Sequence, residues 1–367
     1  MSNMSNIPSN NDTLPDICSK GSIGLSKEMC TSCEQNKNVG SSDSNTNTSS
    51  SSYVDDAVDG IDKITISDNE INTNIRLSTC ACCGKEGSDS DMNVCNKCEM
   101  VKYCNAACKK KHRSKHKKKC DRRVAELHDE VLFKQPPPKE DCPICFLRMP
   151  SLWTGHKYKV CCGKVICSGC IYEVKMKGAA LCPFCRTPTC TTEKELVKQT
   201  MKRIEHDNDS HAMFNLGCNY DYGEFGLPQN RAKGLEFWHR ASELGHSGAY
   251  YNIGNAYLHG DVVKRDEMKS IYYYELAAIL GDVDARFHLG ELEVKAGIMD
   301  RALKHYMIAA AFGYSDSLKQ IKQLYTSGHA TKEDYTKALR AHQAYLDEIR
   351  SDQRDQAAAA RDEYKYY

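Results

Sequence analysis

Apolar residues recur at a fixed, long period in the C-terminal third of the chain. One triplet returns at spacings of 37 and 36 residues, as Asn215-Leu216-Gly217, Asn252-Ile253-Gly254 and His288-Leu289-Gly290. An alanine-rich segment that closes on glycine follows each triplet, at 241–245, 277–281 and 309–313. A period in the mid-thirties predicts one pair of helices per repeat, stacked into a solenoid. Glycine suits the ends of such helices and their close crossings.

A fourth, degenerate unit follows at 314–349 and has Lys322 where the first helix of the other units has glycine. We interpret this unit as a cap, and we expect residues 351–367 to form a polar tail. The units from 209 to about 313 resemble Sel-1-like repeats, which are relatives of the tetratricopeptide repeat. That resemblance implies an all-α solenoid that binds protein substrates or adaptor peptides.

Residues 1–78 show no such repeat, and polar side chains predominate there. Ser and Asn supply 22 of the first 52 residues, and the segment carries 5 basic and 11 acidic side chains. Such a chain cannot bury enough apolar surface to offset its ordering entropy, so we predict disorder. The scattered isoleucines of 61–77 can form a short strand or a docking peptide. Cys30 and Cys33 are interpreted as unstructured thiols.

A short amphipathic pattern lies between the polar N-terminus and the repeats. Apolar residues near one face predict a helix from Asp121 to Lys134, namely Val124, Leu127, Val131 and Leu132. Three prolines, Pro136 to Pro138, stop this helix and form a stiff spacer. We assign 124–139 to this helix and proline linker.

Cysteine is the residue type that says most about the chemistry of the chain. The chain has 21 cysteines in 367 residues, and 17 of them fall between Cys80 and Cys190. The N-terminus carries no secretory signal pattern and no apolar run is long enough to span a bilayer, so we expect a cytoplasmic or nuclear protein without membrane partners. Disulfides are rare in a reducing compartment, and this density therefore indicates metal ligation.

The first group of candidate ligands comprises eight residues in four pairs. They are Cys80, Cys83, Cys95, Cys98, Cys104, Cys108, His116 and Cys120. Eight ligands complete two tetrahedral zinc sites, and a segment of about 40 residues needs metal to fold on so small a core. Cys82 is a spare thiol, although the two-residue spacing favours Cys83.

This spacing resembles the MYND-type zinc finger across residues 79–123, including the segment Val101-Lys102-Tyr103-Cys104. The resemblance implies an interleaved arrangement: Cys80, Cys83, Cys104 and Cys108 hold one zinc, and Cys95, Cys98, His116 and Cys120 hold the other. MYND fingers bind protein partners, often short proline-rich peptides. Many members carry Trp after the first His of the last helix, where this chain has Arg113 after His112.

The closing part of the finger is strongly basic. Eight of the eleven residues from Lys109 to Lys119 are Lys or Arg. Two interpretations stay open: a nuclear-import signal or nucleic-acid patch, and a solvated helix face between ligands. We favour the solvated face and expect no nucleic-acid partner, because no ββα finger spacing is present.

A second group of cysteines lies between 140 and 190 and resembles a RING finger. By that resemblance, Cys142, Cys145, Cys167 and Cys170 hold the first zinc, and Cys182 and Cys185 hold part of the second. Lys164 stands where a typical RING has a ligating His, and a protonated Lys cannot bind zinc. Adjacent Cys161 and Cys162 can supply the two missing thiolates. The alternatives are a three-cysteine site completed by His156, or an empty second site.

Three further residues match positions at which ubiquitin-ligase RING fingers contact a ubiquitin-conjugating enzyme. Ile144 and Pro183 match a shallow apolar groove, and Arg186 matches an arginine that donates hydrogen bonds to ubiquitin and its carrier. The resemblance implies a RING-type ubiquitin-protein ligase with a conjugating enzyme as partner and four structural zinc ions. The alternative is a zinc-finger scaffold protein without a transferase role.

The expected fold is therefore multidomain, with a disordered N-terminus, two small zinc-stabilised cross-brace modules and a C-terminal all-α solenoid. The expected segments are disordered 1–78, MYND-type finger 79–123, linker 124–139, RING-type finger 140–190, repeats 207–350 and tail 351–367. No nucleophile–base group or glycine-rich phosphate loop stands out in the sequence.

Overall fold

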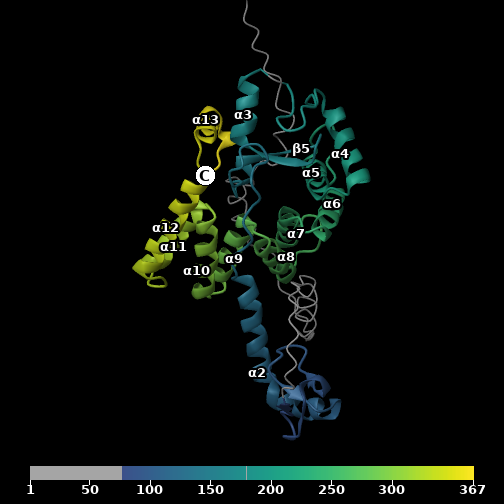
Figure 1. Cartoon of the computed structure of the whole chain (residues 1–367), viewed down its shortest axis with the longest axis vertical. Helices are drawn as coiled ribbons and strands as arrows, with labels where there is room; N and C mark the ends of the chain where they lie inside the picture. Colours follow the sequence, from purple (N-terminus) through teal and green to yellow (C-terminus); the bar gives the residue numbers. More distant parts are fainter. Residues whose placement is uncertain (1–76, 179) are drawn as a thin grey trace, which may run out of the picture. The chain divides into compact units, whose positions relative to one another are not determined.

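A computed structural model describes residues 77–178 and 180–367. These residues fall into two compact units, a finger unit at 77–134 and a larger unit at 135–367 (Figure 1). Most of the segment predicted to be disordered lies outside the described residues, as do Cys30, Cys33 and residues 61–76. Its last two residues belong to a strand, β1, which spans Leu77–Thr79.

The finger unit contains little regular structure besides one helix. Strand β1 pairs antiparallel with β2 (Glu86–Ser88), and β3 (Asn93–Val94) pairs antiparallel with β4 (Lys102–Tyr103). A 3-10 turn, η2 (Asp89–Asp91), and helix α2 (Ala106–Leu132) complete it. The buried cluster of the finger consists of Cys80, Cys95, Cys98, Tyr103 and Cys120. Because four of its five members are cysteines, metal ligation must replace an apolar core here.

Helix α2 is one continuous helix of 27 residues, whereas the sequence pattern predicted a separate helix from Asp121. The segment from Ala106 to Leu132 contains no glycine or proline, so the ligand-bearing helix continues through Asp121 without a break. Arg123 forms ion pairs with Glu126 and Glu130, which support the extension. The helix ends at Leu132, shortly before the three prolines.

Among the described residues, no helix has both the length and the apolar character needed to cross a membrane.

The RING-like module opens the larger unit. It comprises η3 (Trp153–Gly155), the antiparallel hairpin of β5 (His156–Lys159) and β6 (Lys164–Cys167), and helix α3 (Ser168–Met176). Its core is again rich in cysteine, with the members Cys142, Met149, Ile166, Cys167, Cys170, Ile171 and Cys182. Both cysteine-rich modules therefore depend on ligation more than on apolar burial.

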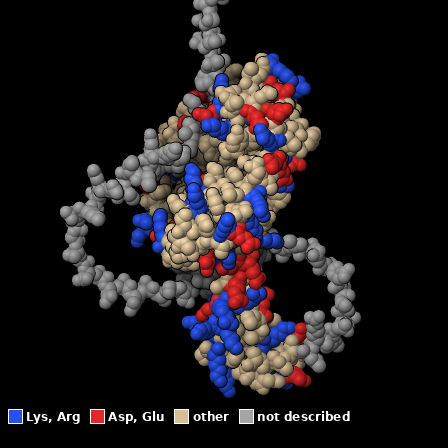
Figure 2. Space-filling view, turned by 90° about the vertical axis from the view of Figure 1, so that its left-hand side faces the viewer, with Lys and Arg blue, Asp and Glu red and all other residues tan. Residues whose placement is uncertain are grey.

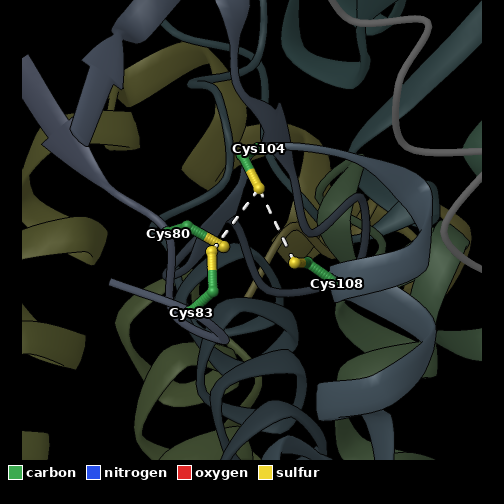
Figure 3. Close-up of side chains that lie close together, drawn as sticks. All are labelled: Cys80, Cys83, Cys104 and Cys108. Atoms are coloured by element: carbon green, nitrogen blue, oxygen red, sulfur yellow. Dashed lines mark hydrogen bonds between the residues drawn. The ribbon is translucent and has the colours of Figure 1, made fainter. Parts of the chain in front are cut away.

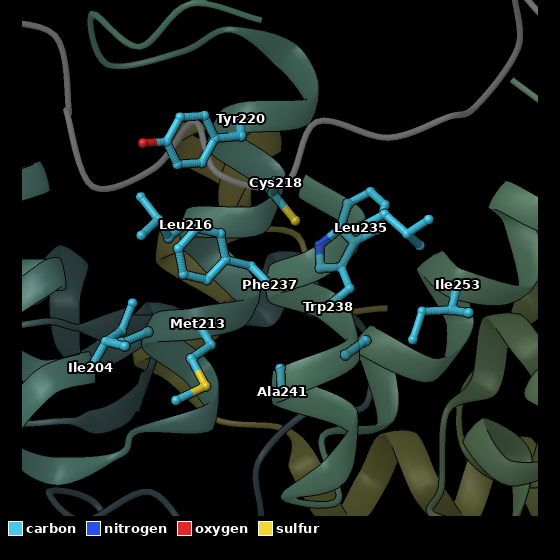
Figure 4. Close-up of a cluster of buried hydrophobic side chains, with 12 residues drawn as sticks. Ile204, Met213, Leu216, Cys218, Tyr220, Leu235, Phe237, Trp238, Ala241 and Ile253 are labelled. Carbon is cyan, nitrogen blue, oxygen red and sulfur yellow. The ribbon is translucent and has the colours of Figure 1, made fainter. Parts of the chain in front are cut away.

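An array of helices follows the RING-like module. The members are α4 (Glu193–Asp207), α5 (Ser210–Tyr222), α6 (Arg231–Glu243), α7 (Ser247–His259), α8 (Glu267–Ile279), α9 (Val283–Lys295), α10 (Met299–Ala311), α11 (Ser315–Thr326) and α12 (Lys332–Ile349). Helices pack in sequential pairs, α5 with α6, α7 with α8 and α9 with α10. Figure 4 shows the core of the first pair, where Leu216, Phe237 and Trp238 interdigitate. The predicted all-α solenoid is confirmed.

The repeated glycines lie where the two helices of each pair cross. A Cβ atom at Gly217, Gly254 or Gly290 would lie 2.7, 2.7 or 2.5 Å from an aromatic ring of the second helix. Those rings belong to Trp238, Tyr274 and Tyr306, respectively. Only a residue without a side chain allows these approaches. In the fourth unit, Lys322 is exposed, so no close crossing occurs there.

Residues 351–367 are not the polar tail that we expected. Helix α13 (Asp352–Ala360) and η4 (Asp362–Tyr364) pack back onto the RING-like module, and α13 contacts α3. Arg354, Tyr364 and Tyr366 are almost completely buried. The tyrosines supply large apolar surfaces, and their burial stabilises a segment whose remaining composition is polar.

The RING-like module contacts both ends of the helical array. On one side, the Tyr158 hydroxyl of β5 donates a hydrogen bond to Asp209, the N-cap of α5, at 2.8 Å. On the other side, the backbone N–H of Ser151 donates to the Tyr345 hydroxyl of α12 at 2.6 Å. The module and the repeats are therefore parts of one body.

We predict that Gly254→Val destabilises the larger unit. The new side chain must push Tyr274 out of a fully buried position, and overpacking of this kind costs about 1–3 kcal/mol. Chemical denaturation followed by circular dichroism measures the free energy of unfolding. The matched control is Lys322→Val at the equivalent, exposed position of the fourth unit. Equal stability of the two variants would contradict the crossing at Gly254.

Candidate metal centres

The first candidate centre, finger site 1, comprises Cys80, Cys83, Cys104 and Cys108. Cys80 and Cys83 flank the turn between β1 and β2, and Cys104 directly follows β4. The Asn105 side chain accepts a hydrogen bond from the backbone N–H of Cys108 at 2.9 Å. This bond caps the N-terminus of α2, whose first turn carries Cys108 to the cluster. The Cys104 sulfur lies 3.7 Å from that of Cys83 and 3.6 Å from that of Cys108 (Figure 3).

Finger site 2 comprises Cys95, Cys98, His116 and Cys120, all of them buried. His116 and Cys120 lie four residues apart on α2 and so share one face of the helix. The Cys95 and Cys120 sulfurs are 3.8 Å apart, and His116 Nε2 lies 3.2 Å from the Cys98 sulfur. Sites 1 and 2 draw alternately on the chain, which is the interleaved arrangement that the resemblance implied.

RING site 3 comprises Cys142, Cys145, Cys167 and Cys170. The first pair lies in the loop after the proline linker, whereas Cys167 ends β6 and Cys170 lies in the first turn of α3. The Cys145 and Cys167 sulfurs are 3.7 Å apart, and those of Cys142 and Cys170 are 4.0 Å apart.

RING site 4 comprises Cys161, Cys162, Cys182 and Cys185. Cys162 lies 3.9 Å from Cys182, and Cys185 lies 3.5 Å from Cys161, measured between sulfurs. Lys164 is not a member of this group, and its ammonium lies 5.9 Å from the centre of the Phe184 ring.

His156, the alternative fourth ligand, lies on β5 and is not a member of this group. Burial, with a smaller effect of nearby Lys139, lowers the pKa of His156 to about 3. The structure therefore brings together four cysteines at site 4 without a histidine.

The geometry of the four groups fits tetrahedral zinc. Zinc–sulfur bonds of about 2.3 Å in a tetrahedron place two sulfurs about 3.8 Å apart. The sulfur–sulfur distances given above range from 3.5 to 4.0 Å, and a disulfide requires about 2.05 Å. Each group offers four protein ligands within 4.8 Å of one another. Four clusters in this chain can therefore each hold a zinc ion, in closed sites of the structural kind.

Interactions within the clusters lower the pKa of some thiols and raise that of others. In finger site 1, hydrogen bonds from the backbone N–H groups of Cys104 and Cys83 lower the pKa of Cys80 to about 6. In RING site 3, hydrogen bonds from the Cys145, Cys167 and Cys170 thiols lower the pKa of Cys142. In the same two sites, hydrogen bonds with Cys104 and Cys142 raise the pKa of Cys108 and Cys170, respectively. Because the thiolate is the metal ligand, Cys80 and Cys142 are the thiols most readily available to zinc in their sites.

Four of the cysteine pairs form the same tight turn. In each of them, the residue after the second cysteine adopts a left-handed backbone conformation, and its N–H donates to the carbonyl of the first cysteine at 2.9–3.0 Å. These residues are Gly84, Glu99, Phe146 and Arg186. Residues inside and just after these pairs keep exposed surface. Phe146 is 76% exposed, and Arg186 is exposed as well.

The three residues matched to conjugating-enzyme contacts all lie on turns of this kind. Ile144 is half-buried inside the Cys142/Cys145 pair, where its inner side packs on the core of the module. Pro183 is half-buried inside the Cys182/Cys185 pair, and Arg186 follows that pair. All three residues therefore keep solvent-accessible surface.

One residue near these centres was missed by sequence reasoning. Arg354 of α13 places its guanidinium beside Cys145 of RING site 3. It lies in a stretch of Ser, Asp and Gln, where an arginine normally points to solvent. The available signal was the cluster of tyrosines at the end of the chain, which is unusual for a solvated tail.

The basic run of the finger lies on the exposed surface of α2. His116 and Cys120 are buried, whereas most of the Lys and Arg residues between 109 and 119, and Arg113 itself, are exposed. Lys and Arg side chains gather accordingly on the surface of the finger unit in Figure 2. This arrangement agrees with a solvated face between ligands.

Two family models match parts of the chain. The MYND finger model matches residues 80–120, and the Sel1 repeat model matches 210–246 and 247–282. The chain thus contains a MYND finger and Sel1 repeats.

Curated relatives also match parts of the chain. The chain is 31% identical over 112 residues to "E3 ubiquitin-protein ligase RNF182" of Ailuropoda melanoleuca, a match over 29% of this chain and 42% of that protein. It is 43% identical over 67 residues to "E3 ubiquitin-protein ligase GW2" of Oryza sativa subsp. indica, over 17% of this chain and 15% of that protein. The chain therefore spans less than half the length of either relative.

Among solved structures, a Sel1 repeat protein from Oxalobacter formigenes aligns with 53% of this chain and 72% of that chain. The identity is 25% and the TM-score is 0.38.

We predict that the purified protein holds four zinc ions per chain and that Cys162→Ser holds three, because serine is a poor zinc ligand. Metal analysis by mass spectrometry gives the ratio. Cys190→Ser is the matched control, since Cys190 lies outside the four clusters, and it should keep four ions. A wild-type count of three or fewer would remove Cys161 and Cys162 from the ligand set.

Proposed function

We propose that this protein is a RING-type ubiquitin-protein ligase that recruits protein substrates through its repeats and its MYND finger. The observation that carries the proposal is the presentation of Ile144 and Pro183 on two turns of the same shape, each held between two cysteines of a metal centre. Ile is usually buried, and a half-exposed Ile on a rigid turn is suited to enter a partner's surface. The matches to two E3 ubiquitin-protein ligases support this interpretation.

A ligase of this class performs no covalent chemistry with its own side chains. The acceptor amine attacks the thioester between ubiquitin and the conjugating enzyme, and the cysteine of that enzyme leaves. The ligase accelerates this step by holding the thioester-linked pair in a reactive arrangement, which is catalysis by positioning. We assign to the exposed Arg186 the role of fixing that arrangement, since a guanidinium can donate hydrogen bonds to two partners at once.

The metal centres serve this role indirectly. All four clusters have a full set of protein ligands, so zinc would hold the turns that carry Ile144, Pro183 and Arg186 and would contact no substrate.

A scaffold protein without transferase activity is the second candidate. It is favoured by Lys164, which occupies the position of the ligating His of a typical RING and is not a member of RING site 4. In that case the RING-like module would act as a rigid support for the repeats.

We predict that Ile144→Ala abolishes stimulated ubiquitin discharge from a panel of charged conjugating enzymes. Loss of a central apolar contact in a small interface costs about 2 kcal/mol, which weakens binding about thirtyfold. Leu339→Ala is the matched control, because Leu339 is an exposed leucine on α12. Arg186→Ala should retain binding of the conjugating enzyme and slow discharge about tenfold or more, as loss of charge-assisted hydrogen bonds does.

All variants should keep four zinc ions. If the wild-type protein stimulates no enzyme of the panel, or if Ile144→Ala and Arg186→Ala are as active as wild type, the ligase proposal fails and the scaffold takes its place.

A further inference from the structure

Arg354 is a completely buried arginine at the junction of α13 and RING site 3. Its Nη1 donates to the backbone carbonyls of Arg148 at 2.9 Å and Ile349 at 2.5 Å. Its Nη2 donates to the carbonyl of Leu147 at 3.4 Å and lies 3.9 Å from the Cys145 sulfur. All of these acceptors but one belong to the loop that carries Cys145.

The charge of this guanidinium has no carboxylate partner among the described residues. Two acidic side chains near Arg354 in sequence are engaged elsewhere, since Glu348 pairs with Arg148 at 2.7 Å and Asp355 pairs with Arg350 at 3.0 Å. Carbonyl groups are dipoles and cannot neutralise a charge. A buried cation is normally paired with an anion, because removing it from water without compensation is costly.

RING site 3 supplies the missing negative charge when it holds zinc. Four thiolates around one divalent zinc carry a net charge of −2, and Cys145, one of these ligands, is the closest of them to Arg354. A hydrogen bond between a guanidinium and a thiolate is charge-assisted at both ends.

We propose that Arg354 is the counter-ion and outer hydrogen-bond donor of RING site 3, so that the C-terminal helix α13 completes a zinc centre whose ligands lie about 200 residues earlier in the chain. The inference depends on zinc at site 3 and not on ligase activity. Arg354 is a positioning residue, which acts on the metal through Cys145 and on the turn that carries Ile144 through the carbonyls of Leu147 and Arg148.

The local packing is adapted to this contact. A Cβ atom at Gly169 of α3 would lie 2.9 Å from Arg354 Cγ and 2.9 Å from its backbone nitrogen. Glycine at this position allows α13 to approach α3 closely enough for the guanidinium to reach the loop of Cys145. Lysine could supply the charge but not the planar fork that serves several acceptors at once.

The contact links zinc binding to docking of the C-terminal segment. If the loaded centre stabilises the buried guanidinium, then the docked guanidinium stabilises the loaded centre to the same extent. Loss of a hydrogen-bond partner of a metal ligand typically weakens metal binding 10–100-fold. Removing zinc from site 3 should in turn release residues 352–366 from the RING-like module.

The test compares Arg354→Met and Arg354→Lys with Arg350→Met in the full, zinc-loaded chain. Arg350 lies four residues away, is exposed and provides the same substitution as a matched control. Zinc release to the chromophoric chelator 4-(2-pyridylazo)resorcinol is followed over time. The cobalt-loaded proteins report the thiolate-to-metal charge-transfer band, which moves to lower energy when a thiolate loses a hydrogen-bond donor. A residue that only fills space would not move this band.

We expect one zinc per chain to leave at least tenfold faster from Arg354→Met, with a smaller effect in Arg354→Lys and none in Arg350→Met. A fraction of the charge-transfer intensity should shift in Arg354→Met. Wild-type release rates in both Arg354 variants would overturn the proposal. Faster release with an unchanged charge-transfer band, or together with loss of the helical signal, would assign Arg354 to packing alone and would also overturn it.

A measurement on the wild-type chain avoids variants that fail to fold. Hydrogen exchange followed by mass spectrometry, with and without chelator, should show loss of protection at 352–366 while α7 and α8 stay protected. Retained protection at 352–366 after zinc removal would contradict the link between the metal centre and the C-terminal helix.

Discussion

Coordination of zinc by cysteine is the constraint on which both small modules depend. In the finger unit, four of five buried cluster residues are cysteines, so removal of the metal would leave polar thiols where a core should be. Each candidate site joins segments that lie far apart in sequence, such as Cys80 with Cys108 and Cys142 with Cys170. The short strands and turns between these residues have too few contacts of their own to define a fold. Metal ligation therefore sets the positions of Ile144, Pro183 and Arg186 as well.

The RING-like module does not stand apart from the repeats. Hydrogen bonds from Tyr158 to Asp209 and from Ser151 to Tyr345 fix it to the start of α5 and to α12, and α13 packs along α3. A partner bound by the repeats would thus sit at a defined position relative to the exposed turns of the RING-like module. For a protein proposed to act by positioning, one compact unit that carries both surfaces is an advantage over two domains on a flexible linker.

Sequence reasoning captured what local spacing and periodicity encode. The pairs separated by two residues and the ligands four apart on α2 each define a turn or a helix face, and the repeated glycines mark helix crossings. Two features escaped it, and the second of them depends on contacts between distant segments. No glycine or proline stands between the ligand-bearing part of the finger helix and the helix predicted to begin at Asp121. The two therefore form one continuous helix, α2. The residues after 350 look polar, yet Arg354, Tyr364 and Tyr366 become buried against a module about 200 residues away.

The central claim, that four centres built from fifteen cysteines and one histidine organise the chain, is tested most directly by zinc K-edge X-ray absorption on the purified protein. The spectrum should be dominated by zinc–sulfur scattering at about 2.3 Å, with about one nitrogen among sixteen ligands and no oxygen shell. Oxygen ligands, or a nitrogen share of a quarter or more, would contradict the account, because the clusters described above would then not be the sites that hold the metal.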